Sequence, residues 1–294
     1  MKIRLEQLNP TIGDLSGNRD LILKAIRNAE SDDIDLLLLP ELVLCGYPPM
    51  DLIERNVFRE LCYQINEKII SETGNMAVIF GSITENLTGV GRTCYNSAIV
   101  AQHGEKIGVA NKTLLPTYDV FDDLRYFEPG KDCDPIEING ISFGVTVCED
   151  IWFNDNEIQY HTYDVNPAQQ LAEKGAKAII NISASPYSKN KPVSRVQMLQ
   201  KHAKQLALPL FYVNQVGANT ELIFDGDSLA LDPSGFIVTR DERFTPTFVD
   251  VDYDAELQKL NAGKYAECER TVPEKVSMMF HALVLGVKDY LCKS

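Results

Sequence analysis

Short apolar runs that stop abruptly at a polar residue are the feature that most constrains the fold of this chain. Leu36–Leu39 leads into Glu41, and Ile141–Val147 leads directly into Cys148. Ala178–Ile182 is a third run of the same kind. Continuous apolar runs of this length are typical of strands that are covered on both faces, since both alternating sets of side chains must then be apolar. The chain therefore needs helices or a second sheet on each side of a buried sheet.

Amphipathic helical segments alternate with the early strands. Asn18–Ala29, for example, places its apolar residues at helical spacing on one face. Later in the chain, His103-Gly104 and the turn at 232–235 predict hairpins between neighbouring strands. This combination predicts a mixed α/β fold with helices outside the sheets, organised as one domain. The other predicted helices are Phe58–Ile70, Pro167–Lys174, Val193–Leu206 and Pro273–Leu291.

Composition excludes several classes of protein. The net charge of −14 argues against nucleic acid or an anionic membrane as the main partner. No apolar run approaches the roughly 18 residues that span a bilayer, and the first ten residues lack the apolar core of a signal peptide. The seven cysteines are scattered without a CxxC pair, so neither a zinc site nor a disulfide framework is expected. Free thiols of this kind fit a reducing cytoplasm.

Cys148 is the first candidate for chemistry. A cysteine at the end of an apolar strand sits on a rigid edge, where polar groups can surround the sulfur. Glu149 and Asp150 follow it, and then the only tryptophan, Trp152. The alternative is a small buried hydrophobic residue, which is the usual role of a free cysteine.

Glu41 and Lys112 stand in similar places. Glu41 comes just after the four-leucine run, where a carboxylate is partly withdrawn from water, as suits a general base. Lys112 follows an apolar strand and opens an aromatic and acidic loop, 111–130. Each residue has a plainer interpretation as a solvated strand end. The carboxyl ends of strands gather at one rim of such sheets, however, where ligands bind, so the two are expected to meet Cys148.

The surrounding motifs resemble one family closely. ELVLCGYPPMDL, NKTLLPTYDVFDDLRYFEPG, CEDIW, NISASPY and NQVGANTELIFDGDS together look like the glutaminase domains of glutamine-dependent NAD(+) synthetases. These domains belong to the nitrilase superfamily of carbon-nitrogen hydrolases. The resemblance covers nearly the whole chain. It implies a four-layer α-β-β-α sandwich and a homo-oligomer.

The resemblance also implies the catalytic roles. Cys148 attacks the side-chain amide carbon of glutamine, and Glu41 takes the thiol proton and later activates water. Lys112 stabilises the tetrahedral oxyanion together with the backbone N–H of Glu149. Ammonia leaves, and hydrolysis of the resulting thioester yields glutamate.

Substrate contacts follow from the same resemblance. Tyr118 is expected to contact glutamine, and Tyr47 to line the pocket. Ser185 and Lys191 match positions that hold the amino-acid end of glutamine, and Glu149 is placed to pair with its α-ammonium. An ordinary turn is the alternative for Ser185 and Lys191.

Two departures from the family pattern limit what the resemblance implies. Asp123 occupies the place of a second acid in the superfamily but is one methylene shorter, so it is expected to support Lys112 less directly. In addition, no glycine-rich SGGxDS loop is present. The chain thus reads as a hydrolase domain, 1–272, followed by a helix, 273–294, that leads toward an absent synthetase domain or a split partner. That domain would use ATP and deamido-NAD, whereas the glutaminase reaction requires no cofactor and no metal.

Three alternative functions are also compatible with the sequence. The first is a free-standing amidase acting on another ω-amide, with Asn154–Asn166 altering specificity. The second is a papain-like Cys/His enzyme, although none of the histidines has a privileged relation to Cys148 in the sequence. The third is a regulatory domain that keeps the fold without turnover. The four histidines are His103, His161, His202 and His281.

Overall fold

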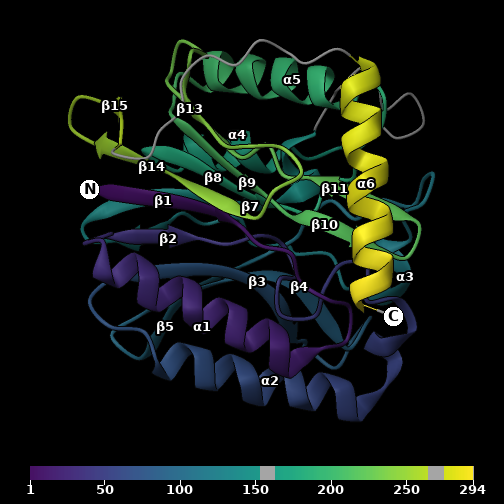
Figure 1. Ribbon diagram of the computed structural model, residues 1–294. Coiled ribbons are helices and arrows are strands. Elements are labelled where there is room, and N and C mark those ends of the chain that lie inside the picture. The colour runs from purple at the N-terminus through teal and green to yellow at the C-terminus, as the bar shows by residue number, and fades with distance from the viewer. Residues whose placement is uncertain (153–162, 264–274, 294) are drawn as a thin grey trace.

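The computed structural model describes residues 1–152, 163–263 and 275–293. Within these residues the strands form a seven-stranded sheet, a six-stranded sheet and a two-stranded ribbon. The two large sheets lie face to face between two layers of helices (Figure 1). The expected α-β-β-α sandwich is therefore confirmed.

The seven-stranded sheet has a parallel centre and antiparallel edges. Its order is β15-β14-β1-β2-β3-β4-β5, in which β1, β2 and β3 run parallel and the other neighbouring pairs are antiparallel. The bounds are β1 Lys2–Gln7, β2 Leu36–Leu38, β3 Ala77–Glu85, β4 Cys94–Gln102, β5 Glu105–Asn111, β14 Thr247–Asp254 and β15 Lys259–Ala262.

The six-stranded sheet repeats this plan. Its order is β13-β12-β9-β8-β7-β6, and β7, β8 and β9 form the parallel centre. The ribbon pairs β10 with β11 in antiparallel fashion. The bounds are β6 Ile136–Ile138, β7 Ile141–Val147, β8 Ala178–Ser183, β9 Leu210–Asn214, β10 Val216–Asn219, β11 Leu222–Asp225, β12 Leu229–Leu231 and β13 Ile237–Arg240.

Helices cover the outer face of each sheet. In Figure 1, α1 and α2 lie against the seven-stranded sheet, and α4 and α5 lie on the far side of the six-stranded sheet. The helix α6 stands at one end of the sandwich beside β10 and β11. The bounds are α1 Leu15–Ser31, η1 Met50–Glu54, α2 Asn56–Ser71, α3 Asp123–Tyr126, η2 Cys148–Ile151, α4 Pro167–Glu173, α5 Lys191–Leu206 and α6 Lys275–Lys293.

Alternation along each strand explains why the apolar runs are continuous. In β2 and just beyond it, Leu37 and Leu39 face the helices, whereas Leu36 and Leu38 face the other sheet. Successive side chains of a strand point to opposite faces, so a strand between two apolar layers needs apolar residues at every position. Each such side chain, fully buried, contributes roughly 1.5–3 kcal/mol.

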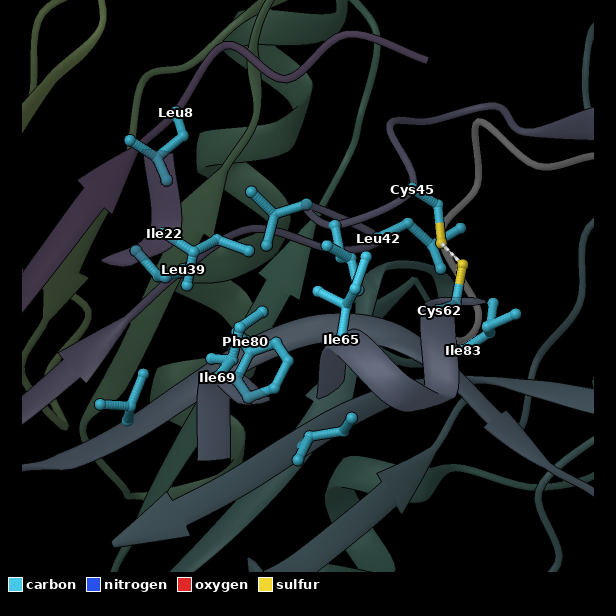
Figure 2. Packing of buried hydrophobic residues seen from close by; sticks show 14 of the residues in the cluster. Leu8, Ile22, Leu39, Leu42, Cys45, Cys62, Ile65, Ile69, Phe80 and Ile83 are labelled. Atoms are coloured by element: carbon cyan, nitrogen blue, oxygen red, sulfur yellow. Dashed lines mark hydrogen bonds between the residues drawn. The ribbon is translucent and has the colours of Figure 1, made fainter. Parts of the chain in front are cut away.

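Figure 2 shows the layer between α1, α2 and the seven-stranded sheet. Phe80 of β3 packs there among side chains of both helices, including Ile22 and Ile69. The thiols of Cys45 and Cys62 lie 3.7 Å apart in the same layer. The hydrogen bond to Cys62 and burial raise the pKa of Cys45 well above its usual value, so the thiol packs as a small apolar group.

Most elements match the sequence predictions, with ends that differ by a few residues. Asn166 caps α4 as expected, since its side chain accepts the N–H of Gln169 at 3.1 Å. The short strands β6, β10, β11 and β15 were not predicted, because three or four residues are too few to show a period. The Asn154–Asn166 segment lies largely outside the described residues, as does Pro273, the predicted start of the last helix.

The last helix carries an exposed apolar face. Apolar and aromatic residues recur along α6 at spacings of three and four, the pattern of a helix that packs against a partner. No helix in the described parts of the chain is long and apolar enough to cross a membrane. The exposed residues on this face are Val276, Met279, Phe280, Leu283, Val284, Val287, Tyr290 and Leu291.

Candidate active site

The three candidate catalytic residues come from two different sheets and meet at one rim. Glu41 and Lys112 follow β2 and β5 of the seven-stranded sheet, and Cys148 follows β7 of the six-stranded sheet. The strands β2 and β5 run in the same direction, because β5 is two antiparallel steps from β3 and β2 is parallel to β3. All three residues are buried, and Cys148 is the most exposed of them, at 8%.

Lys112 lies at the centre of an ionic cluster. Its ammonium Nζ is 2.8 Å from Oε1 of Glu41 and 2.7 Å from Oδ2 of Asp123. Burial alone would lower the pKa of Lys112, but the charges of Asp123 and Glu41 raise it well above its usual value. The site therefore holds a permanent cation where water is largely excluded.

Both oxygens of the Glu41 carboxylate have fixed partners. Besides Lys112, Oε1 accepts a hydrogen bond from Nδ2 of Asn96 at 2.7 Å. Oε2 accepts the backbone N–H of Ala184 at 2.8 Å, just after β8 in the opposite sheet. These contacts fix the orientation of the carboxylate. Asn96 was not singled out from the sequence, although an amide within an apolar strand was a usable signal.

Cys148 occupies a strained turn. It begins the 3₁₀ turn η2 with a φ of +44°, a left-handed conformation that non-glycine residues seldom adopt and that clusters at functional sites. Burial raises the pKa of the thiol, and the charge of Glu41 raises it further, while Lys112 lowers it. The resting thiol is neutral, so it needs a base to become a nucleophile.

Glu149 lies beside the nucleophile between two tyrosines. Its Oε1 accepts hydrogen bonds from the hydroxyls of Tyr118 at 2.9 Å and Tyr163 at 3.1 Å. Burial raises the pKa of Glu149, and the charges of Lys112 and Lys191 lower it. Tyr118 was predicted to be part of the site. Tyr163 was not, because it falls in a polar segment without a motif.

Lys191 and Ser185 approach from the six-stranded sheet. Lys191 opens α5, and its Nζ lies 4.9 Å from the ring centroid of Trp152. Burial lowers the pKa of Lys191, whereas the charges of Cys148 and Glu149 raise it, so the ammonium is electrostatically coupled to both. Ser185 is anchored through its backbone N–H, which donates to Oδ1 of Asn214 at 2.8 Å.

The side-chain hydroxyl of Ser185, unlike its backbone N–H, is not held by a hydrogen bond in the described part of the chain. Its Oγ is buried and has no hydrogen-bond partner among the residues that the structure describes. A buried hydroxyl without a partner costs free energy unless a ligand supplies one. The hydroxyl of Ser185 is therefore available to bond a ligand.

Tyr47 and Asp123 complete the cluster, and one expectation was wrong. Asp123 was expected to support Lys112 less directly, yet its Oδ2 makes a 2.7 Å ion pair with the ammonium. Its Oδ1 accepts the hydroxyl of Tyr47 at 3.0 Å. The shorter side chain suffices because Asp123 begins α3 and its backbone N–H donates to the carbonyl of Pro116, which turns the loop back toward Lys112.

The groups that act on the Cys148 thiol are carboxylates and amines. Glu41, Lys112, Glu149 and Lys191 shift its pKa. His103 lies in an exposed turn, His281 of α6 stacks on Phe244, and His161 falls outside the described residues. In the described ranges, no three or more His, Cys, Asp or Glu side chains are grouped to hold a metal ion.

Several known proteins are similar to this chain in sequence. The chain is 38% identical to a protein named glutamine-dependent NAD(+) synthetase from Synechocystis sp., over 99% of this chain and 52% of that protein. It is 34% identical to a protein of the same name from Thermotoga maritima, over 100% of this chain and 54% of the relative. The chain thus spans about half the length of the curated relatives it matches.

Solved structures of other proteins have the same fold. A glutamine-dependent NAD+ synthetase from Acinetobacter baumannii superimposes with a TM-score of 0.88 at 32% identity, over 99% of this chain and 52% of that one. An amidase from Nesterenkonia sp. AN1 shares the fold, with a TM-score of 0.73 at 22% identity, over 86% of this chain and 90% of the amidase. The sequence pattern of the family described as carbon-nitrogen hydrolase matches residues 2–261. The chain belongs to the carbon-nitrogen hydrolase family.

Proposed function

We propose that this chain is a glutamine amidohydrolase in which Cys148, Glu41 and Lys112 form the catalytic triad. The observation that carries the proposal is the buried Lys112 ammonium, held 2.8 Å from the Glu41 carboxylate at the rim where Cys148 adopts its strained turn. A base and a cation so placed suit attack by a thiol on an amide. The names of the relatives, which are glutamine-dependent enzymes, support glutamine as the amide.

The first half-reaction forms a thioester. Glu41 accepts the proton of the Cys148 thiol as Sγ attacks the side-chain amide carbon of glutamine. The carbonyl oxygen becomes an oxyanion, which Lys112 and the backbone N–H of Glu149 stabilise. When the tetrahedral intermediate collapses, the carbon-nitrogen bond breaks, Glu41 returns the proton to the leaving nitrogen, and ammonia departs.

The second half-reaction releases glutamate. Glu41, again a carboxylate, takes a proton from water, and the resulting hydroxide attacks the thioester carbon. A second oxyanion forms at the same place, and its collapse expels the Cys148 sulfur, which recovers the proton from Glu41. One base therefore serves both steps, which agrees with the fixed hydrogen bonds to both of its oxygens.

The neighbouring charges suit the amino-acid end of glutamine. Glu149 presents a buried carboxylate for the α-ammonium, and Lys191 presents an ammonium for the α-carboxylate. Ser185 supplies the buried hydroxyl that has no other partner in the described structure. Tyr118 orients Glu149 through its 2.9 Å hydrogen bond. A substrate with one charge of each sign satisfies both groups, whereas an aliphatic amide leaves them unpaired.

Ammonia from this site would serve a second catalytic unit. We infer that residues 1–272 form the hydrolase domain and that the helix of 273–294 leads to a synthetase domain, on the same chain or on a separate one. The exposed apolar face of α6 supports this, because such a face favours burial against a partner. ATP and deamido-NAD would bind only to that partner. A homo-oligomer of hydrolase domains is part of the same proposal.

One experiment tests nucleophile and substrate class together. The protein is incubated with a diazoketone analogue of glutamine and examined by intact mass and peptide mass spectrometry. We expect one adduct, on Cys148, that excess glutamine prevents. Cys292→Ser serves as the control, because Cys292 is an exposed thiol and its loss should not change the labelling. Adducts that spread over several cysteines and ignore glutamine would overturn the proposal.

A substrate panel separates the remaining candidates. Ammonia release from glutamine, but not from aliphatic ω-amides or nitriles, favours the glutaminase. Release from short aliphatic amides with equal efficiency favours a free-standing amidase. A wild-type protein that binds glutamine without turnover would point to a regulatory domain. The measurement is ammonia released per active site in a coupled assay.

A further inference from the structure

Asp150 makes hydrogen bonds that join the two halves of the site. It lies two residues after Cys148 in η2 and is only 2% exposed. Its Oδ1 accepts the backbone N–H groups of Thr113 at 2.9 Å and Leu114 at 2.8 Å. Its Oδ2 accepts the backbone N–H of Val147 at 3.0 Å.

The partners of this carboxylate flank two catalytic residues. Thr113 and Leu114 directly follow Lys112 in the loop after β5 of the seven-stranded sheet, whereas Val147 ends β7 of the six-stranded sheet and directly precedes Cys148. The nucleophile and the cation belong to different sheets, so nothing in either sheet alone sets the distance between them. One carboxylate bonded to both backbones ties the two residues together directly.

The chemistry of the contact suits a carboxyl group with two acceptor oxygens, and the three backbone donors oppose the rise in the pKa of Asp150, to about 7, that burial causes. All three partners are donors, and an aspartate carboxylate offers only acceptors. An asparagine of the same shape would turn an NH₂ group toward at least one backbone N–H. Displacement of a reacting group by about 1 Å costs on the order of 100-fold in rate, so the loss of one of these bonds has a measurable consequence.

We propose that Asp150 is a positioning residue that holds Cys148 and Lys112 at a fixed separation across the two sheets. The inference rests on the proposed function, since it assigns a role within the same reaction. Asp150 acts through the backbone beside the two catalytic groups and does not touch the substrate. Its loss therefore lowers kcat and leaves the KM for glutamine nearly unchanged.

Asp150→Asn is the test, and Asp289→Asn is its matched control. Asp289 is also buried, at 4% exposure, and its Oδ2 accepts the backbone N–H of Ala218 at 2.7 Å, but it lies on α6. We expect Asp150→Asn to lower kcat on the order of 100-fold, with KM within about threefold of the wild type. Asp289→Asn should keep kcat within about twofold of the wild type, even if it lowers Tm as much as Asp150→Asn does. A kcat for Asp150→Asn close to wild type, or an equal loss in the control, overturns the inference.

A second variant covers the case in which Asp150→Asn does not fold. Asp150→Glu keeps the charge but moves the carboxylate by one methylene. Positioning predicts a kcat at least about tenfold below wild type, whereas a purely electrostatic role predicts wild-type kcat and overturns the inference.

Alkylation of Cys148 by iodoacetamide separates this inference from the proposed function, because it needs no glutamine. We expect Asp150→Asn to slow labelling of Cys148 at least about tenfold relative to Asp289→Asn. If labelling shows this difference but wild-type protein releases no ammonia from glutamine, the proposed function fails and the positioning role stands. Equal labelling rates in the two variants overturn the positioning role.

Discussion

The carboxylate of Asp123 lies 2.7 Å from the ammonium of Lys112, and a second carboxylate, that of Glu41, lies 2.8 Å from the same ammonium. One buried cation thus bridges two buried anions. The cluster carries a net negative charge before substrate arrives, and the hydrogen bond from Tyr47 to Asp123 takes up part of it. This arrangement keeps Lys112 charged.

Replacing Asp123 should impair catalysis more than folding. Asp123→Asn keeps the shape and a partner for Tyr47 but removes one charge from the Lys112 ammonium. A hydrogen bond to a charged group contributes about 2 kcal/mol, and we expect kcat to fall roughly 10- to 100-fold through misplacement of Lys112. Steady-state kinetics and thermal unfolding measure the two effects. Asp122→Asn, an exposed neighbour, is the control and should match wild type; equal kinetics in both variants would contradict the role of Asp123.

Glu41→Gln should remove the base while preserving the pocket. The amide retains one acceptor, but its NH₂ must face a donor, either Ala184 N–H or the Lys112–Asn96 side. General-base catalysis contributes about 10²–10⁴-fold, so we expect kcat to fall by that amount. The binding of glutamine, measured by calorimetry, should change little. Wild-type ammonia release by this variant would refute the assignment of the base.

The two tyrosines that hold Glu149 should control affinity for glutamine. Tyr118→Phe and Tyr163→Phe each remove one hydroxyl donor from the Glu149 carboxylate. A hydrogen bond to a charged acceptor is worth about 1.5–3 kcal/mol, so we expect each change to raise KM about tenfold or more. Tyr95→Phe is the control, because its hydroxyl bonds Asn86 away from the site. A drop in kcat at constant KM would assign the tyrosines to the chemical step instead.

His202 should affect acid stability but not turnover. Burial lowers its pKa to about 4, with a further contribution from Lys201, whereas an unfolded histidine titrates near 6.5. Between these values the unfolded chain binds the extra proton, so the stability from neutral His202 is fully present above about pH 6.5 and is lost as pH falls toward 4. The loss amounts to about 3 kcal/mol.

The difference in unfolding free energy between wild type and His202→Ala isolates this effect. This difference should shrink by about 3 kcal/mol from pH 7 to pH 4. The packing that the variant also loses contributes equally at every pH. Ammonia release at pH 7.5 should persist in folded His202→Ala. Complete loss of activity in a folded variant would revive a Cys/His mechanism.

The two faces of α6 should respond differently to substitution. Leu285 is buried at 6% exposure, and its replacement by alanine should cost about 2–5 kcal/mol of stability. Leu283 is 64% exposed, so Leu283→Ala should leave the isolated chain within about 0.5 kcal/mol of wild type. Denaturant unfolding of both variants makes the comparison. A large loss from Leu283→Ala would show that its face is already covered in the isolated chain.

The sequence was sufficient for the longer elements, though not for the short strands β6, β10, β11 and β15, and it indicated the central residues of the site. Continuous apolar runs predicted buried strands, because both faces of such strands need apolar side chains. Polar residues at their ends indicated Glu41, Lys112 and Cys148, and the structure brings all three to one rim. The layered fold was implied by the family resemblance that the motifs carry.

Only the tertiary structure decided how these residues act on one another. Asn96, Ala184 and Asp150 orient the site through contacts between segments far apart in the chain or on opposite sheets. Such contacts leave no periodic signal, because their partners are single backbone or amide groups. Asp123 shows the same limit: its side-chain length suggested an indirect role, but the path of the backbone through α3 brings its carboxylate to Lys112. Local sequence sets which groups are present, whereas the packing of two sheets sets the distances on which their chemistry depends.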